Sequence, residues 1–248
     1  MVTIKTLEEI ELMRKANQID RDTLLMLEEH IKPGVTTKEL DKLAYEYITK
    51  CNAKPSFLGY NGFPASICTS VNEQVVHGIP SSKVRLEEGD IISVDCGTIY
   101  KGFNGDAART FMVGNCSEEV KKLVEVTKQS FFEGIKILKA GVRLGDLGSA
   151  IQTYCESFGY GVVRDLVGHG IGRDMHEDPS VPNYGKPGHG MRLQTNMTIA
   201  VEPMITLGTY KVWQLEDGWT IETQDGKPAA HYENTIWIKE DGVEILSL

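Results

Sequence analysis

Hydrophobic residues recur with a helical period in four segments of the chain, and each segment has recognisable start and stop signals. The first predicted helix begins near Thr6, because Thr6 and Glu9 have the spacing of a capping box. It ends before Lys32-Pro33-Gly34, since proline cannot continue a helix. The other helices are expected at about 36–52, from 117 to just before 141, and at 144–158.

Apolar runs between and after these helices predict strands. Residues 91–97 and 106–113 flank a stretch rich in turn signals, so we expect a hairpin. A two-residue turn at Tyr100-Lys101 would place Asp95 directly opposite Asp106. In the last predicted strand, AAHYENTIWI, His231 and Glu233 would share one face.

Two parts of the pattern match each other at an offset of 107 residues. KPGVTTKEL at Lys32 is similar to KAGVRLGDL at Lys139, and VRLEEGDIISVD, ending at Asp95, aligns with MRLQTNMTIAVE, ending at Glu202. This predicts duplicated halves, about 1–115 and 116–248, each with two helices followed by strands. Since no linker-like segment separates them, we expect one catalytic domain, 1–248, of the α/β (α+β) class with a largely antiparallel sheet.

The repeat places a carboxylate at the same point of each half. Asp95 and Glu202 each follow an apolar strand, IISV and TIAV. Burying such a group is costly unless it is paired or bound to metal, although a strand-end carboxylate facing water is the simpler alternative for either one alone. Asp106, across the hairpin from Asp95, adds a like charge that cations would neutralise.

His169 lies between glycines in GHGIG, and these small neighbours let the backbone approach another group closely. The candidate metal ligands are therefore Asp95, Asp106, His169, Glu202 and Glu233. Oxygen donors with one imidazole suit manganese, iron, cobalt or zinc and argue against a closed structural zinc site.

Composition narrows the function classes. The formal net charge of −9 argues against nucleic-acid binding. Five cysteines without a C-x-x-C pair indicate free thiols and a reducing, cytoplasmic location. No apolar run reaches the roughly 18 residues of a membrane span, and no secretory signal is visible.

Several motifs carry a family resemblance. They are NEQVVHGIP at Asn72, DCGTIYKGFNGDAARTF at Asp95, GHGIG at Gly168, HEDP at His176, VEPM at Val201 and YENT at Tyr232. Together they resemble the type I methionine aminopeptidases of the creatinase, or pita-bread, family over essentially the whole chain. The short spacing between His169 and Glu202 resembles that of type I enzymes. The sequence starts directly at the catalytic region, as the bacterial short forms do.

This resemblance implies a pita-bread fold: pseudo-twofold halves and a curved, largely antiparallel sheet covered by helices. It implies a dinuclear metallo-aminopeptidase that removes the N-terminal methionine from nascent proteins and peptides, preferring a small second residue. The five candidate residues would hold two divalent ions, with Glu202 also relaying a proton. His176 would contact the scissile carbonyl, and His77 the peptide beside the cleaved bond.

The family's methionine pocket would correspond to Tyr60, Phe63, Cys68 and Trp219, and aromatic walls with a sulfur suit a thioether. Phe63 stands where many members have tyrosine, and Asn61 where some have histidine, so substrate preference could shift. The resemblance also suggests a monovalent cation near Asn72 and Gln74. His30 and His189 match no catalytic motif.

The family further implies a monomer that associates transiently with the ribosome exit region and uses no specific nucleic acid or membrane. Two rival interpretations stay open. A dipeptidase or proline-specific aminopeptidase of the same superfamily would share the five ligands, usually with an added N-terminal domain. A catalytically inactive pita-bread module that binds peptides would usually have lost some of them.

Overall fold

The computed structural model describes residues 2–248 and contains four α-helices in that range. They are α1 (Leu7–Glu28), α2 (Thr37–Lys50), α3 (Glu118–Ile135) and α4 (Leu144–Glu156). Thr6 and Thr36 cap α1 and α2 through complete capping boxes, as the spacing predicted. The predicted ends of α1 and α3 were too late. After α3, the backbone of Ala140 bonds to Lys239, which draws the chain away from the helix axis.

Fifteen strands and one short 3₁₀ helix complete the fold of residues 2–248. The strands are β1 (Lys54–Pro55), β2 (Ile67–Val71), β3 (Gln74–Val76), β4 (Ile91–Tyr100), β5 (Phe103–Met112), β6 (Gly161–Val162), β7 (Gly168–Gly170), β8 (Glu177–Val181), β9 (Thr198–Val201), β10 (Met204–Thr206), β11 (Val212–Gln214), β12 (Ile221–Thr223), β13 (Ala229–His231), β14 (Glu233–Ile238) and β15 (Val243–Ile245), and the 3₁₀ helix is η1 (Tyr60–Gly62). Nine strands form one antiparallel sheet in the order β1-β4-β5-β14-β9-β7-β8, with β2 also pairing with β4 and β15 with β14.

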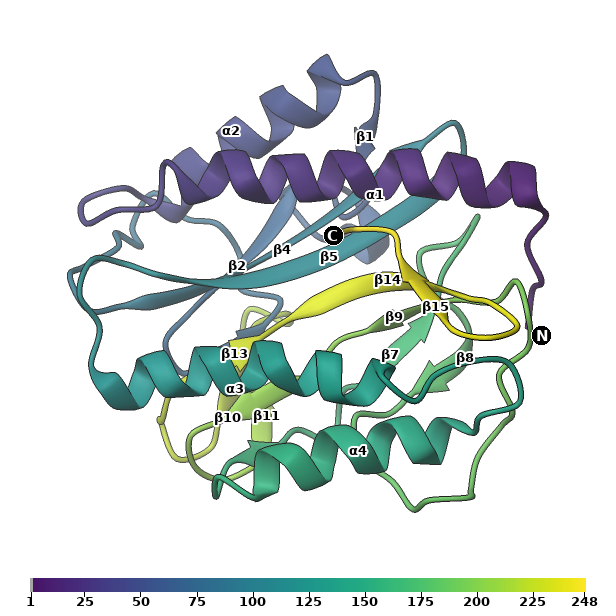
Figure 1. The fold of residues 1–248 in the computed structure, drawn as a ribbon. Coiled ribbons are helices and arrows are strands. Elements are labelled where there is room, and N and C mark those ends of the chain that lie inside the picture. Colours follow the sequence, from purple (N-terminus) through teal and green to yellow (C-terminus); the bar gives the residue numbers. More distant parts are fainter. Residues whose placement is uncertain (1) are drawn as a thin grey trace.

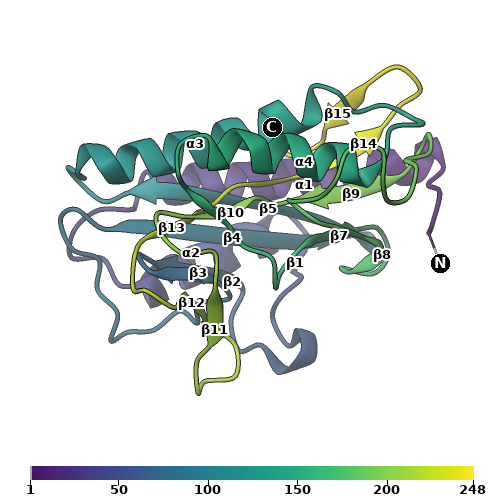
Figure 2. The same ribbon diagram turned by 90° about the horizontal axis from the view of Figure 1, so that it is seen from below.

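The helices α1, α3 and α4 lie along one face of this sheet, whereas β11 and β12 project from the other (Figures 1 and 2). Each half has its own apolar core. Leu40 and Ile92 belong to the core of the first half, and Leu147 and Ile199 to that of the second. Neighbouring strands β5 and β14 join the halves, so one continuous sheet crosses the boundary between them.

Two kinds of backbone contact recur at the offset of 107 residues. An isolated β-bridge joins Thr36 to Arg85, and another joins Arg143 to Arg192, each partner 107 positions later. The side chain of Arg85 donates to the carbonyl of Gly34, and Arg192 donates to that of Gly141, again at the same offset. The repeat therefore reflects equivalent backbone contacts in the two halves.

The hairpin of β4 and β5 exists, but its predicted register was wrong. Its turn lies at Lys101-Gly102, where φ is 49° and 84°, and not at Tyr100-Lys101. A tight hairpin turn with two positive φ angles favours glycine, and Gly102 supplies it one residue later than expected. Asp95 therefore faces Ala108, and Asp106 faces Gly97. Because side chains alternate along a strand, the two aspartates still share one face as diagonal neighbours.

The predicted final strand divides at Tyr232. Its first part, β13, pairs with β10, and its second part, β14, pairs with β5 and β9. The chain thus changes neighbours between His231 and Glu233. Within residues 2–248, no helix has the length and apolar character needed to cross a bilayer.

Candidate active site

The five predicted ligands meet on five consecutive neighbours of the sheet. Asp95 lies in β4, Asp106 in β5, Glu233 at the start of β14, Glu202 directly after β9, and His169 in β7. These strands follow one another in the sheet order, and all five side chains line one cavity. The sheet therefore gathers residues that are up to 138 positions apart in the sequence.

Distances between the side chains are those of a cluster that can surround ions. The Nε2 atom of His169 lies 3.6 Å from Oδ2 of Asp106 and 3.7 Å from Oε1 of Glu202. Ligand atoms of Asp106, His169 and Glu233 all lie within 4.8 Å of one another. A second such group consists of Asp95, Glu233 and His231, a histidine that the sequence had placed only on the same face as Glu233.

Glycines on both sides of His169 permit its position. A Cβ on Gly168 would lie 2.4 Å from the carbonyl oxygen of Ala200, and one on Gly170 would lie 2.2 Å from that of Asp178. The Nδ1–H of His169 donates to the carbonyl of Gly170 at 2.9 Å. Its Nε2 lone pair therefore faces the carboxylates, which is the arrangement of a metal-binding imidazole.

Burial dominates the electrostatics of the cluster. It raises the pKa of Asp106 to about 7 and raises the pKa of Asp95 and Glu202 well above the usual values, and neighbouring carboxylates raise the latter two further. The pKa of Glu233 is raised well above its usual value for the same reasons. Burial lowers the pKa of His169, so its ring is neutral near pH 7.

These residues fit divalent metal ions. Oδ1 of Asp95, Oδ1 of Asp106 and Oε1 of Glu233 are buried without a hydrogen-bond partner. Several acidic groups packed together with unsatisfied oxygens are unfavourable unless cations neutralise them. Carboxylate oxygens and a neutral imidazole are ligands that such ions accept.

The same cavity, with a volume of about 410 Å³, holds the predicted substrate residues beside the cluster. Phe63 and Cys68 are buried, and the rings of Phe63 and Trp219 meet edge to face at 5.1 Å. Phe57 packs against this group and also lines the cavity. It was not predicted from the sequence, although it lies only three residues before Tyr60. The result is an apolar recess next to a polar cluster.

Two further histidines complete the cavity. His77 has a φ of 60°, and the following Gly78 approaches β2 so closely that a Cβ there would lie 2.1 Å from the carbonyl oxygen of Thr69. Burial lowers the pKa of His77. His176 packs on His169 with ring centroids 4.3 Å apart, and its Nδ1 lies 2.8 Å from the hydroxyl of Tyr60. Burial and then the charge of His169 lower the pKa of His176 to about 4.

Other predicted residues lie outside this cavity. Asn72 accepts a hydrogen bond from the backbone of Ile91 and donates one to Asp90, while Gln74 accepts one from the backbone of Val71. The monovalent-cation site near them stays a prediction.

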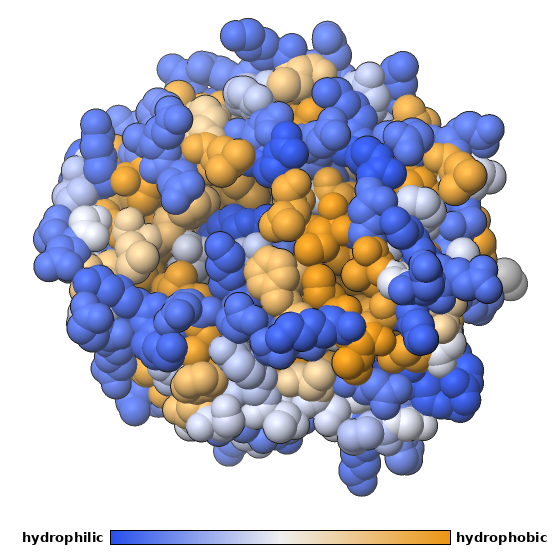
Figure 3. Space-filling model, viewed as in Figure 1, coloured by the Kyte–Doolittle hydropathy of each residue, from blue (hydrophilic) through white to orange (hydrophobic). Residues whose placement is uncertain are grey.

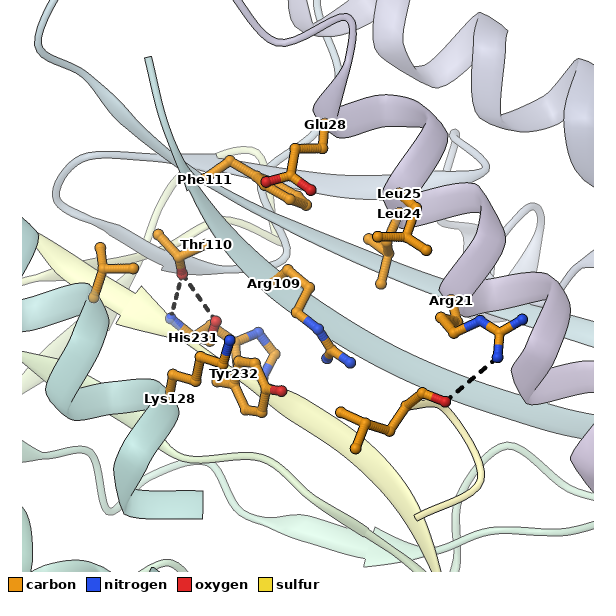
Figure 4. A pocket seen from close by; sticks show the side chains of 12 residues that line it. Arg21, Leu24, Leu25, Glu28, Arg109, Thr110, Phe111, Lys128, His231 and Tyr232 are labelled. Carbon is orange, nitrogen blue, oxygen red and sulfur yellow. Dashed lines mark hydrogen bonds between the residues drawn. The ribbon is translucent and has the colours of Figure 1, made fainter. Parts of the chain in front are cut away.

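A second cavity, of about 350 Å³, lies on the opposite face of the sheet, between α1 and α3. Hydrophobic side chains gather in the middle of this face (Figure 3). Cationic Arg21 and Lys128 stand beside the cavity, and Arg109 lies over the ring of Tyr232 at 4.4 Å (Figure 4). His231 and Tyr232 also line this cavity.

An antiparallel sheet that brings buried carboxylates and an imidazole to a pocket defines the class of a metal-dependent hydrolase. The chain matches the family model described as metallopeptidase family M24 over residues 11–240. It is 60% identical to a methionine aminopeptidase of Clostridium acetobutylicum, covering 100% of this chain and 99% of that one, and 51% identical to methionine aminopeptidase 1 of Bacillus subtilis, at 100% and 99% coverage. The chain therefore belongs to metallopeptidase family M24.

Solved structures agree. The crystal structure of a methionine aminopeptidase from Thermotoga maritima has a TM-score of 0.98 and 48% identity, covering 100% of this chain and 99% of that chain. A prolidase from Pyrococcus furiosus has a TM-score of 0.78 and 25% identity, and this chain covers only 65% of it. The expected pita-bread fold is thus confirmed, and its relatives by sequence over the full length are methionine aminopeptidases.

Proposed function

We propose that the protein removes the N-terminal methionine from nascent proteins and peptides, preferring a small second residue. The observation that carries this proposal is the apolar recess of Phe63, Cys68 and Trp219 beside a cluster of buried carboxylates. An unbranched thioether fits aromatic walls and a soft sulfur, and burial raises the pKa of Cys68 so that its thiol stays neutral. The similarity to methionine aminopeptidases over the full chain supports the same activity.

Two divalent ions would be held by Asp95, Asp106, His169, Glu202 and Glu233. Glu233 belongs to both ligand groups and would serve both ions. Asp106 would do the same, since its strand β5 lies between β4, which carries Asp95, and β14, which carries Glu233. When bound, the ions would supply Lewis-acid activation of water and of the substrate carbonyl. Manganese, iron, cobalt and zinc all suit this donor set.

His176 would donate a hydrogen bond to the scissile carbonyl. The Tyr60 hydroxyl can donate to Nδ1 of His176, which leaves the proton of the neutral ring on Nε2. A neutral donor held in this way stabilises negative charge that develops on the carbonyl oxygen. Tyr60 would therefore fix the tautomer of His176, and His77 would contact the peptide beyond the cleaved bond.

Glu202 would take the proton of the attacking water and pass it to the leaving amine. A carboxylate beside the reacting groups can accept a proton and return it, which is the role of a general acid–base group. Because Glu202 is also a ligand, its substitution changes both roles.

Hydrolysis of a Met-Gly-initiated peptide tests this function. We expect turnover that a chelator abolishes and added divalent ions restore, and an X-Pro peptide should be a poor substrate. The exposed His189 offers a control, since His189→Gln should keep normal turnover. Preference for the X-Pro peptide, or turnover unaffected by chelation, would contradict the proposal.

The setting of the reaction is also a proposal. The five cysteines are free thiols, which fits a reducing compartment, and we place the protein in the cytoplasm as a monomer that meets its substrates near the ribosome exit.

A further inference from the structure

His231 stands beside the carboxylate cluster, and the mechanism above does not use it. It is the last residue of β13, and its side chain is 1% exposed. Its Nε2 lies 3.8 Å from Oε2 of Glu202 and 3.7 Å from Oε2 of Glu233. Neither ring nitrogen has a hydrogen-bond partner, although the ring is buried and faces the carboxylates of Glu202 and Glu233.

The backbone of His231 is fixed by the side chain of Thr110, which lies on the same face of β5 as Asp106. Its N–H donates to the hydroxyl of Thr110 at 2.9 Å, and its carbonyl accepts from the same hydroxyl at 2.8 Å (Figure 4). Its other neighbour is Met204 in β10. Thr110 lies in β5, the strand that carries Asp106, so the ring has a defined place relative to the cluster.

Comparison with His169 indicates which ring nitrogen of His231 carries the proton. Nδ1 of His169 donates to a carbonyl, which leaves Nε2 as a lone pair for a metal. Nδ1 of His231 has no acceptor, and its Nε2 is the nitrogen that faces two carboxylate oxygens. A proton on Nε2 is therefore the tautomer that the surroundings stabilise.

The two oxygens of Glu202 divide between the two rings: Oε1 faces His169, and Oε2 faces His231. Glu233 also turns Oε2 toward His231, while its Oε1 has no partner. We propose that His231 is a positioning residue: in the metal-loaded protein its Nε2–H donates to the outer oxygens of Glu202 and Glu233, which lie 3.8 and 3.7 Å from it here, so that their other oxygens point at the metal ions. This role rests on the proposed function only in that metal ions occupy the cluster.

A pair of substitutions tests the donor. In His231→Leu the N–H is lost, whereas His231→Gln keeps an N–H donor on a side chain of similar reach. Calorimetric titration with manganese should give an affinity lower by about 10- to 100-fold for His231→Leu, as for other partners of metal ligands, and within a few-fold of the original for His231→Gln. With a Met-Gly-initiated peptide, kcat should fall in His231→Leu while KM changes little. Equal affinity and kcat in His231→Leu and the parent protein, or a glutamine variant as impaired as the leucine variant, would overturn the proposal.

Nitrogen-15 NMR of the imidazoles in the parent protein loaded with zinc gives a readout that needs no variant and no activity. We expect the proton of His231 on Nε2, in contrast to His169. A metal-coordinated Nε2 would make His231 a direct ligand and would overturn the positioning role. If the protein binds metal but does not cleave the peptide, the proposed function fails, whereas the affinity and NMR results still decide the role of His231.

Discussion

In the first half of the chain, Thr36 bridges to Arg85, and Asp95 lies inside β4, which continues to Tyr100 and not, as expected, only to about residue 97. In the second half, Arg143 bridges to Arg192, and Glu202 directly follows β9. The side chains around these shared contacts differ. The first half supplies both aspartates and most of the apolar recess, whereas the second supplies the imidazole His169 and both glutamates.

This difference separates the placement of the ligands, which the backbone provides, from the chemistry of the site, which the side chains provide. Neighbouring strands of both halves meet in one sheet, and the backbone contacts that repeat at an offset of 107 residues are alike in the two halves. The side chains of the site are not symmetric, because the proposed binding of a thioether and the proposed transfer of a proton need different groups. Changes at equivalent positions of the halves should therefore have different effects at the site and similar effects in the backbone contacts.

The largest effect is expected at the equivalent pair Asp95 and Glu202. Glu202→Gln should lower kcat by about 10²- to 10⁴-fold, the range for losing a general acid–base group. Asp95→Asn should act through metal content, with fewer ions bound per chain. Peptide hydrolysis and elemental analysis of both variants distinguish these outcomes. Near-normal turnover in Glu202→Gln would show that the proton relay lies elsewhere.

A somewhat smaller effect is expected where the two halves meet at a hydrogen bond, between Tyr60 and His176. His176→Ala should lower kcat by about 10²- to 10³-fold, as for other donors to a developing oxyanion, with metal content unchanged. Tyr60→Phe should share part of this loss, because the ring remains but the tautomer is no longer fixed. Loss of metal from His176→Ala would instead make His176 a ligand.

Metal binding should link the halves energetically, since both contribute ligands. A divalent ion at 100 times its dissociation constant should stabilise the fold by about 2.7 kcal/mol. The raised pKa values of the buried acids, with Asp106 at about 7, mean that the metal-free folded protein binds more protons than the unfolded chain between about pH 4 and 7. These buried acids therefore contribute less to the stability of the metal-free protein as the pH rises from about 4 to 7.

Protons compete with metal for the same oxygens, so the metal-induced rise in Tm should be larger at about pH 8 than at about pH 5. Thermal unfolding with and without manganese at both pH values measures this. An equal rise at both would mean that the bound ions do not displace protons from these carboxylates.

The smallest effect is expected in the matched backbone contacts. Arg85→Ala and Arg192→Ala each remove one hydrogen bond to a glycine carbonyl, so each should cost about 0.5–1.5 kcal/mol of stability. Both variants should bind metal normally. Clearly unequal losses in urea unfolding would indicate that the two contacts are not equivalent.

Features that depend on local sequence were predicted well. The caps at Thr6 and Thr36 follow from residues three positions apart, and the repeat predicted that Asp95 and Glu202 come together. The predicted hairpin turn was one residue too early. The turn lies at Lys101-Gly102, because it needs positive φ angles and glycine adopts them without strain. His231 could not be assigned, since its relation to Glu202 arises only when β13 pairs with β10.

The central claim, that five neighbouring strands converge on a pair of divalent ions, is tested most directly by anomalous diffraction from crystals grown with manganese. The account predicts two strong peaks within coordination distance of Asp95, Asp106, His169, Glu202 and Glu233. Density free of anomalous peaks among these side chains, or ions bound elsewhere in the molecule, would contradict it.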